Sequence, residues 1–315
     1  MFNQFFTTRE SEIRFVYTLL IAVIFLILIF FVLGLKVERS NISVPTKTVW
    51  HRFPTVALEA KSAYVYDART KTVLYALNEN QRLPLASITK LMSALVAQEL
   101  SPSYSTITVT KEALLTEGDS GLLSDEKWSL KDLLDFSLVS SSNDGIHAVA
   151  LSLGALDDLN PQAKVAQDDF VRAMNAKALE LDLNNTYFWN DTGLDESEIK
   201  GGAYGTAKDM ATLLEYIIYR EPSIVEATRQ VEVSKVSLDQ HKHEAKNTNQ
   251  IVSEIPGLLA SKTGYTDIAG GNLVFAFDPE LGRPVVISIL GSTAEGRFRD
   301  AEKLIGATLE YIKSN

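Results

Sequence analysis

The sequence predicts a mixed α/β protein of the α+β type, in which strands from both ends of a globular region form one antiparallel sheet flanked by helices. Residues 62–75 give a hairpin signal at the start of this region, and residues 257–290 contain three further strand-like segments. Between them, apolar residues recur at helical spacing, which indicates a helical insert. Ahead of this region, residues 15–35 carry no charged side chain and predict an N-terminal transmembrane helix.

Composition limits the classes of protein to which the chain can belong. With 315 residues and 46% hydrophobic side chains, the chain can bury a large core. Its net charge of -10 argues against a nucleic-acid partner, because phosphate binding needs a basic surface. The absence of cysteine excludes disulfides, thiolate nucleophiles and zinc–thiolate sites.

The apolar run at residues 15–35 is long enough to span a hydrocarbon core of about 30 Å as a helix. A cleaved signal peptide is the alternative, but the run is longer than the usual hydrophobic region of such a peptide. The sequence Gly34-Leu35-Lys36-Val37 at its end also contains no small-x-small cleavage site. The sequence therefore predicts an uncleaved signal anchor.

The charges beside this run do not decide its orientation, because basic residues flank both ends almost equally. They are Arg9 and Arg14 before it, and Lys36, Arg39 and Lys47 after it. A short segment at residues 1–14 ahead of a long globular region favours a cytoplasmic stub in a single-pass protein. Residues 36–55 predict a tether, and residues 56–315 predict one domain outside the cytoplasm.

The elements of the globular domain are predicted from periodicity and capping signals. The first are a hairpin at 62–67 and 72–75 and a helix at 87–100. Further helices are predicted at 130–139, 144–153, 165–181 and 206–219, with Thr206 as an N-cap and an irregular stretch at 184–202. The last elements are three strands and a closing helix, at 257–265, 271–277, 284–290 and 296–312.

Three short strings in this domain carry the residues of a serine-based acyl transfer. They are Ser87-Ile88-Thr89-Lys90, Ser141-Ser142-Asn143 and Lys262-Thr263-Gly264. Together they supply a nucleophile with its own amine base, a second hydroxyl–amide pair and a cationic strand. The S-x-x-K pattern also occurs at 124–127 and 197–200, in acidic surroundings, whereas each of the other two strings occurs once. Their order and spacing therefore select Ser87.

Ser87 and Lys90 are the predicted nucleophile and base. Positions i and i+3 share one helix face, so the hydroxyl and the amine can lie within hydrogen-bond reach. A lysine acts as a base only if its pKa falls well below about 10.4, which requires burial or a neighbouring cation. The apolar residues that follow Lys90 favour burial, and Lys262 is a candidate for the cation.

Ser141 and Asn143 lie where one predicted helix ends and the next begins. A hydroxyl there can relay a proton to a leaving amine, and the carboxamide can bind a substrate amide. Alone, the pair also fits a plain loop with Asn143 as the N-cap. Its place between the other two strings favours the chemical interpretation.

The third string is predicted to open an edge strand. Lys262 and Thr263 offer a charge and a hydroxyl to a substrate carboxylate, and Gly264 permits close approach of a substrate backbone. A peptide can bind along such an edge through main-chain hydrogen bonds. The backbone N–H groups of Ser87 and Tyr265 are candidates for an oxyanion hole.

The three strings resemble the active-site motifs of the serine D-alanyl-D-alanine carboxypeptidases, which are low-molecular-mass penicillin-binding proteins of the S11 peptidase family. The matching stretches are residues 86–92, 141–145 and 262–266, with further similarity at 185–188, 192–195 and 247–249. The resemblance covers roughly residues 60–310 and implies a β-lactamase/DD-peptidase-like fold.

The same resemblance implies roles for single residues. Ser87 would be acylated with Lys90 as its base, and Ser141 with Asn143 would form the second motif. The carboxylate side of the site would contain Lys262 and Thr263. The family also uses an arginine near the last helix to bind the terminal carboxylate, and the residues that match it are Arg297 or Arg299.

By resemblance, the chain is expected to be a membrane-tethered serine carboxypeptidase at the bacterial cytoplasmic membrane, with its catalytic domain outside the cytoplasm. It would remove the terminal D-alanine from peptidoglycan stem peptides through an acyl-enzyme, with neither a metal nor another cofactor. β-Lactam antibiotics would inhibit it by acylating the same serine. The sequence leaves open whether water or an amine accepts the acyl group, so transpeptidase and endopeptidase activities remain alternatives.

Two other functions fit parts of the sequence: a serine β-lactamase, and a catalytically silent module that binds penicillin or peptidoglycan. Residues 180–184 match the E-x-x-L-N string of class A β-lactamases, but helical spacing before them predicts that Glu180 ends a helix. Residues 241–244, His-Lys-His-Glu, suggest a metal site, but their solvated neighbours favour a polar surface hairpin. His51 and His147 are isolated, and neither forms a triad with a serine in the sequence pattern.

Overall fold

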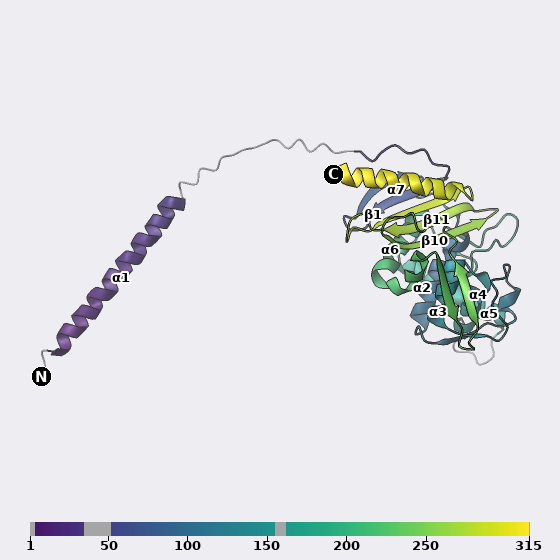
Figure 1. Cartoon of the computed structure of the whole chain (residues 1–315), viewed down its shortest axis with the longest axis horizontal. Coiled ribbons are helices and arrows are strands. Elements are labelled where there is room, and N and C mark those ends of the chain that lie inside the picture. The colour runs from purple at the N-terminus through teal and green to yellow at the C-terminus, as the bar shows by residue number, and fades with distance from the viewer. Residues whose placement is uncertain (1–3, 35–51, 155–161, 315) are drawn as a thin grey trace. The chain divides into compact units, whose positions relative to one another are not determined.

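The structure of the chain is a computed structural model that describes residues 4–34, 52–154 and 162–314 (Figure 1). It divides into two compact units, Met1–Trp50 and His51–Asn315, and each is described by itself. Most of the predicted tether at 36–55 lies outside the described residues, as do residues 1–3 of the predicted stub and Leu35 of the predicted membrane span.

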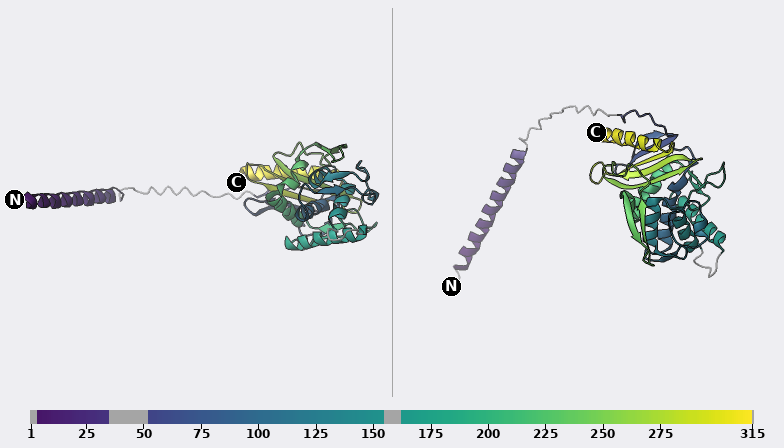
Figure 2. Two further views of the ribbon diagram at one scale, coloured as in Figure 1. Left: turned by 90° about the horizontal axis from the view of Figure 1, so that it is seen from below. Right: turned by 45° about the vertical axis from the view of Figure 1, so that its right-hand side comes forward.

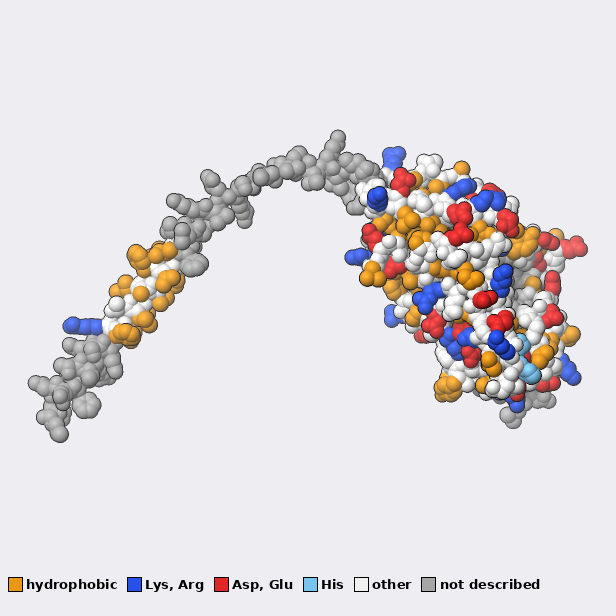
Figure 3. Space-filling model, in the orientation of Figure 1, with side chains coloured by type: hydrophobic (Ala, Val, Ile, Leu, Met, Phe, Trp, Pro, Cys, Tyr) orange, Lys and Arg blue, Asp and Glu red, His pale blue; other side chains and the backbone are white. Residues whose placement is uncertain are grey.

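In the first unit, the apolar run forms most of a long helix, α1 (Gln4–Gly34). The side chains of residues 14–29 are described, and all of them are exposed (Figure 3). Over the part of the chain whose side chains the structure describes, no helix is both long enough and apolar enough to cross a membrane. The helix is therefore confirmed, whereas the predicted membrane span is not.

In the second unit, strands from both ends of the domain form one antiparallel sheet, as predicted. Its strand order is β10–β11–β12–β1–β2. The strands are β1 (Ser62–Asp67), β2 (Thr72–Leu77), β10 (Leu258–Thr266), β11 (Gly270–Phe277) and β12 (Val285–Ser292). The two ends meet where β1 pairs with β12, from Ser62 opposite Leu290 to Asp67 opposite Val285. Strand β10, which carries the third string, lies at one edge.

Both faces of this sheet are covered by helices, so alternate residues of a central strand enter different parts of the core. Ile287 and Ile289 pack with Leu304 of α7 (Gly296–Ser314) on one face. Val286 and Leu290 belong to the core on the other face, which α6 (Ala207–Arg220) helps to form. Figures 1 and 2 show α7 on one side of the sheet and the helical insert on the other.

The helical insert contains the predicted helices and several short elements. The α-helices are α2 (Lys90–Leu100), α3 (Leu130–Ser140), α4 (Asn143–Leu153) and α5 (Ala163–Glu180). The short strands are β3 (Leu83–Pro84), β4 (Thr106–Thr108), β5 (Lys127–Ser129), β6 (Tyr187–Phe188), β7 (Ala203–Gly205), β8 (Glu232–Val236) and β9 (Lys242–Lys246). The 3₁₀ turns are η1 (Ala86–Thr89), η2 (Ala113–Leu115), η3 (Pro222–Ile224) and η4 (Glu226–Arg229).

The predicted N-cap of α6 is confirmed, because the Thr206 side chain accepts a hydrogen bond of 3.0 Å from the Asp209 N–H. Two boundaries differ from the prediction. The helix expected at 87–100 begins as the 3₁₀ turn η1, and the α-helix starts only at Lys90. The third string lies in the second half of β10 and does not open the strand.

Candidate active site

Ser87 lies in the turn η1 directly before α2, and Lys90 is the first residue of that helix. The spacing of three residues brings Lys90 Nζ to 2.8 Å from Ser87 Oγ, as the sequence predicts. Ala86, the residue before the serine, has a φ of +50°. A residue with a Cβ rarely adopts this left-handed conformation, so the turn is held in its shape by the surrounding structure.

The Lys90 side chain is fully buried and makes three hydrogen bonds. Its Nζ donates to Asn143 Oδ1 at 2.6 Å and to the Thr192 carbonyl oxygen at 2.9 Å, in addition to its contact with Ser87. Burial lowers the pKa of Lys90 to about 7, although the carboxylates of Asp191 and Asp144 act in the opposite direction. At neutral pH a large fraction of this amine is therefore available as a base.

The second string forms the tight connection between α3 and α4. Ser141 ends α3 in the left-handed conformation, with a φ of +63°, and Ser142 caps α4 by accepting a hydrogen bond of 2.9 Å from the Gly145 N–H. Asn143 begins α4 and links two parts of the site, because its Nδ2 also donates to the Glu117 carbonyl oxygen at 2.7 Å. The plain-loop interpretation is therefore incomplete, since Asn143 contacts the predicted base directly.

Lys262 brings the third string to the second one. Its side chain is buried, and its Nζ donates to Ser141 Oγ and to the Thr263 carbonyl oxygen, at 2.9 Å each. Burial holds the pKa of Lys262 well below its usual range, and the charges of Lys90 and Arg297 add to this effect. The charge of Lys90 thus lowers the pKa of Lys262, whereas burial, and not the cation predicted at Lys262, lowers the pKa of Lys90.

The edge strand β10 approaches the nucleophile turn most closely at Gly264. A methyl group on this residue would lie 2.7 Å from the Leu85 carbonyl oxygen and 3.2 Å from the Ser87 amide nitrogen. The absence of a side chain is therefore what allows this approach. On either side of Gly264, Thr263 Oγ1 lies 2.6 Å from Thr248 Oγ1, and the Tyr265 side chain is half exposed.

The structure distinguishes the two candidate arginines. Arg297 Nη1 donates to the Gly264 carbonyl oxygen at 2.8 Å, and its Nε is buried with no hydrogen-bond partner among the described residues. Burial lowers the pKa of Arg297. Arg299 instead pairs with Glu59 at 2.7 Å, with half of its side chain exposed. Of these two arginines, Arg297 is the one that is hydrogen-bonded to the third string.

The loop after β6 supplies contacts that the motifs alone did not predict. The Thr192 carbonyl accepts a hydrogen bond from Lys90, and Gly193, with a φ of +83°, packs so closely on the Ala86 carbonyl that a Cβ would clash. The only sequence signal for this loop is the similarity at 192–195. His147 is also not isolated in space, because its Nδ1 lies 3.1 Å from the buried Asp191 carboxylate.

The other patterns in the sequence lie outside this constellation. Glu180 ends α5 and pairs with Lys177 at 2.8 Å, as predicted from helical spacing. Residues 241–244 belong to the hairpin β8–β9, but His243 is not solvated as expected. Its Nε2 lies 2.7 Å from the buried Glu126 carboxylate, and its ring packs on Trp128. Among the described residues, no three acidic, histidine or cysteine side chains are grouped as metal ligands.

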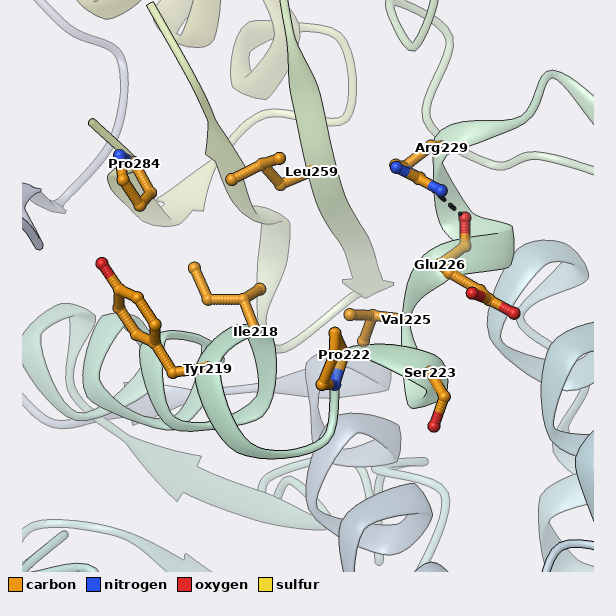
Figure 4. A pocket seen from close by; sticks show the side chains of 9 residues that line it. All are labelled: Ile218, Tyr219, Pro222, Ser223, Val225, Glu226, Arg229, Leu259 and Pro284. Atoms are coloured by element: carbon orange, nitrogen blue, oxygen red, sulfur yellow. Dashed lines mark hydrogen bonds between the residues drawn. The ribbon is translucent and has the colours of Figure 1, made fainter. Parts of the chain in front are cut away.

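A cavity of about 320 Å³ lies elsewhere in the domain, at the end of α6 and beside the first residues of β10 (Figure 4). Ile218, Leu259 and Pro284 form part of its apolar lining. None of the predicted site residues lines it. This cavity is therefore separate from the constellation around Ser87.

Comparison with known proteins gives a consistent result. The sequence profile of the S11 peptidases, described as D-alanyl-D-alanine carboxypeptidases, matches residues 50–293. The D-alanyl-D-alanine carboxypeptidase DacF of Bacillus subtilis is 31% identical over 260 residues, which are 81% of this chain and 63% of DacF. A D-alanyl-D-alanine endopeptidase of Haemophilus influenzae is 30% identical over 226 residues, 70% of this chain and 71% of the endopeptidase.

A solved structure supports the same relationship. The ampicillin-bound crystal structure of penicillin-binding protein D2 from Listeria monocytogenes matches with a TM-score of 0.65 and 27% identity. The match covers 81% of this chain and 98% of that chain. The α+β architecture is therefore that of a penicillin-binding protein structure. The chain nevertheless matches less than two thirds of the length of DacF.

Proposed function

Because this chain belongs to the S11 peptidases, the family of D-alanyl-D-alanine carboxypeptidases, we propose that it removes the terminal D-alanine from peptidoglycan stem peptides through an acyl-enzyme on Ser87. One observation carries the proposal: the fully buried Lys90 amine lies 2.8 Å from Ser87 Oγ. A serine hydroxyl becomes an effective nucleophile when such a base takes its proton.

In the proposed first step, the neutral Lys90 amine accepts the Ser87 Oγ proton while Oγ attacks the carbonyl carbon between the last two D-alanines. The carbonyl oxygen becomes an oxyanion, and the backbone N–H groups of Ser87 and Tyr265 are its proposed donors. The close approach of Gly264 to the Ser87 amide supports this pairing, because it brings the backbone of β10 to the nucleophile turn.

Collapse of this intermediate breaks the peptide C–N bond, and the leaving nitrogen needs a proton. We assign its delivery to Ser141, whose Oγ is hydrogen-bonded to the Lys262 amine. Overall, one proton moves from Ser87 through Lys90 and Ser141 to the departing D-alanine. Water then attacks the ester with Lys90 as base, which regenerates the Ser87 hydroxyl. Asn143, held between Lys90 and the Glu117 carbonyl, is assigned to the substrate amide.

The substrate carboxylate is assigned to Lys262, Thr263 and Arg297. We expect Arg297→Gln to lower kcat/KM about 10- to 100-fold for a peptide with a free terminal carboxylate, because a charge-assisted hydrogen bond is lost. The matched control is Arg299→Gln, which removes an exposed arginine paired with Glu59 and should leave kcat/KM within about twofold. Equal values for the two variants would exclude Arg297 as the carboxylate-binding residue.

We further propose that β-lactams acylate Ser87, since they present a strained amide to the same nucleophile. The ampicillin-bound structure of the Listeria protein supports this assignment by likeness. The labelled chain should release the antibiotic slowly. In a β-lactamase, the glutamate at this position would activate the water that breaks the acyl-enzyme. Here Glu180 instead ends a helix and pairs with Lys177. Time-resolved loss of a fluorescent penicillin measures this rate, and release within seconds would favour a β-lactamase.

We propose that residues 15–35 anchor the protein in the bacterial cytoplasmic membrane, with residues 1–14 in the cytoplasm and residues 56–315 as the catalytic domain outside it. The support is the uncharged run and the exposure of its large apolar side chains in α1. Exposed apolar side chains of this number are costly in water. Membrane fractionation of the full chain and of a form that begins at residue 36 tests the proposal, and equal partitioning would contradict it.

Endopeptidase activity is the second candidate, because the Haemophilus relative carries that name. The same acyl-enzyme would form on Ser87, but the leaving group would be the side-chain amine of a cross-linked peptide. Incubation with cross-linked and uncross-linked peptides in parallel separates the two activities by their products.

A further inference from the structure

A second polar cluster surrounds Asp191, the residue before Thr192. The Asp191 carboxylate at its centre is fully buried. It lies 3.1 Å from His147 Nδ1 and accepts a hydrogen bond of 2.9 Å from Gln167 Nε2. The backbone carbonyl of Asp191 accepts a further hydrogen bond of 2.5 Å from Ser93 Oγ. Three elements therefore hold this one residue: α4 through His147, α5 through Gln167 and α2 through Ser93.

The backbone at Thr192 connects this cluster to the proposed base, Lys90. Thr192 follows Asp191, and its carbonyl oxygen accepts a hydrogen bond of 2.9 Å from Lys90 Nζ. Ser93, which binds the Asp191 carbonyl, lies three residues after Lys90 on the same face of α2. Any shift of Asp191 would therefore move the carbonyl group that orients the amine. The acyl-transfer steps assigned above use neither Asp191 nor His147.

The cluster also acts on Lys90 through charge. The ionisable groups that act on this amine are Asp191 from the loop after β6 and Asp144 from α4, and the amine in turn lowers the pKa of Lys262 on β10. The two carboxylates raise the pKa of Lys90, against the larger effect of burial. The His147 contact lowers the pKa of Asp191, so the carboxylate stays ionised although it is buried.

Resting on the proposed acylation of Ser87, we propose that Asp191 and His147 are positioning residues for Lys90. The pair fixes the Thr192 carbonyl against the amine and places one negative charge near it. The carbonyl keeps Nζ directed at Ser87 and Asn143. The contact with His147 keeps this carboxylate ionised.

Two substitutions test this role through the pH at which the acylation rate reaches half its maximum. Asp191→Asn removes the charge and keeps the shape, so this midpoint should move to lower pH by about one unit. His147→Phe keeps a ring of similar size but removes the hydrogen bond that helps to lower the pKa of Asp191. The pKa of Asp191 then rises and less of its negative charge acts on Lys90, so the midpoint should again move to lower pH, by about half a unit. A fluorescent penicillin measures the rates on the full chain.

Asp135→Asn is the matched control, because Asp135 is also a buried carboxylate but pairs with Lys131 and Lys235 at 2.6 and 2.7 Å, away from Lys90. It should lower the thermal unfolding midpoint and leave the pH midpoint of acylation unchanged. A purely structural role would slow both test variants without moving the pH midpoint. Either test variant that folds decides the matter, and a pH midpoint equal to that of the wild type overturns the inference. Failure of the wild type itself to be labelled would instead contradict the proposed function.

Discussion

Ser87→Ala is expected to abolish covalent labelling by a fluorescent penicillin and to lower D-alanine release from a stem peptide by at least about 10⁴-fold. The reason is that no acyl-enzyme can form without the hydroxyl oxygen. Only one hydrogen bond of the Lys90 amine is lost, and the contacts to Asn143 and Thr192 remain, so the site should keep its shape. Labelling is read on a gel, and D-alanine release by a coupled assay.

The chain contains two matched controls for this substitution. Ser124 and Ser197 occupy the same S-x-x-K pattern, but both are exposed and neither contacts the constellation around Lys90. Ser124→Ala and Ser197→Ala should therefore be labelled at the wild-type rate. Persistent labelling of Ser87→Ala, or loss of labelling in either control, would contradict the assignment of the nucleophile.

Lys90→Met should lower the acylation rate about 10³-fold, because a side chain of similar length remains but the base is lost. In the wild type the pKa of Lys90 is lowered to about 7, and the neutral amine is the active form. The acylation rate should therefore rise with pH through this value, since fewer molecules carry the extra proton above it. The Met variant should lose this rise. Stopped-flow measurement of penicillin acylation between pH 5 and 9 detects both effects.

Lys90→Arg separates the role as a base from the role as a cation. An arginine keeps the positive charge but cannot be deprotonated in a protein, so this variant should be as slow as the Met variant. A rate near that of the wild type would indicate that the positive charge at this position is what acylation requires. A Met variant that keeps the rise near pH 7 would assign that titration to another group.

Much of the fold could be predicted from the sequence because the signals are local. The hairpin β1–β2 and the strands β10 to β12 are short apolar runs bounded by turn residues, and their pairing follows from the need to bury both faces. The spacing of Ser87 and Lys90 likewise fixes their contact within one turn of helix.

Other features could not be predicted because they depend on contacts between distant parts of the chain. Arg297 and Arg299 are two residues apart in α7, so they face different directions, and only the docking of the helix decides which one meets Gly264. His243 has polar neighbours in the sequence, but its hairpin folds over Glu126 and Trp128. His147 is linked to Lys90 through its contact with Asp191 and the hydrogen bond from Lys90 to Thr192. Both Asp191 and Thr192 lie at least 44 positions after the histidine.

The central claim is that Ser87 forms an acyl-enzyme with a peptide that ends in D-Ala-D-Ala. The most direct measurement is mass spectrometry of the full chain, quenched during turnover of a synthetic stem peptide and digested. We predict release of one D-alanine per peptide and an adduct of the shortened peptide on Ser87, with neither product in Ser87→Ala. Release of D-alanine by Ser87→Ala at the wild-type rate, or a folded wild type that yields neither product, would contradict the account.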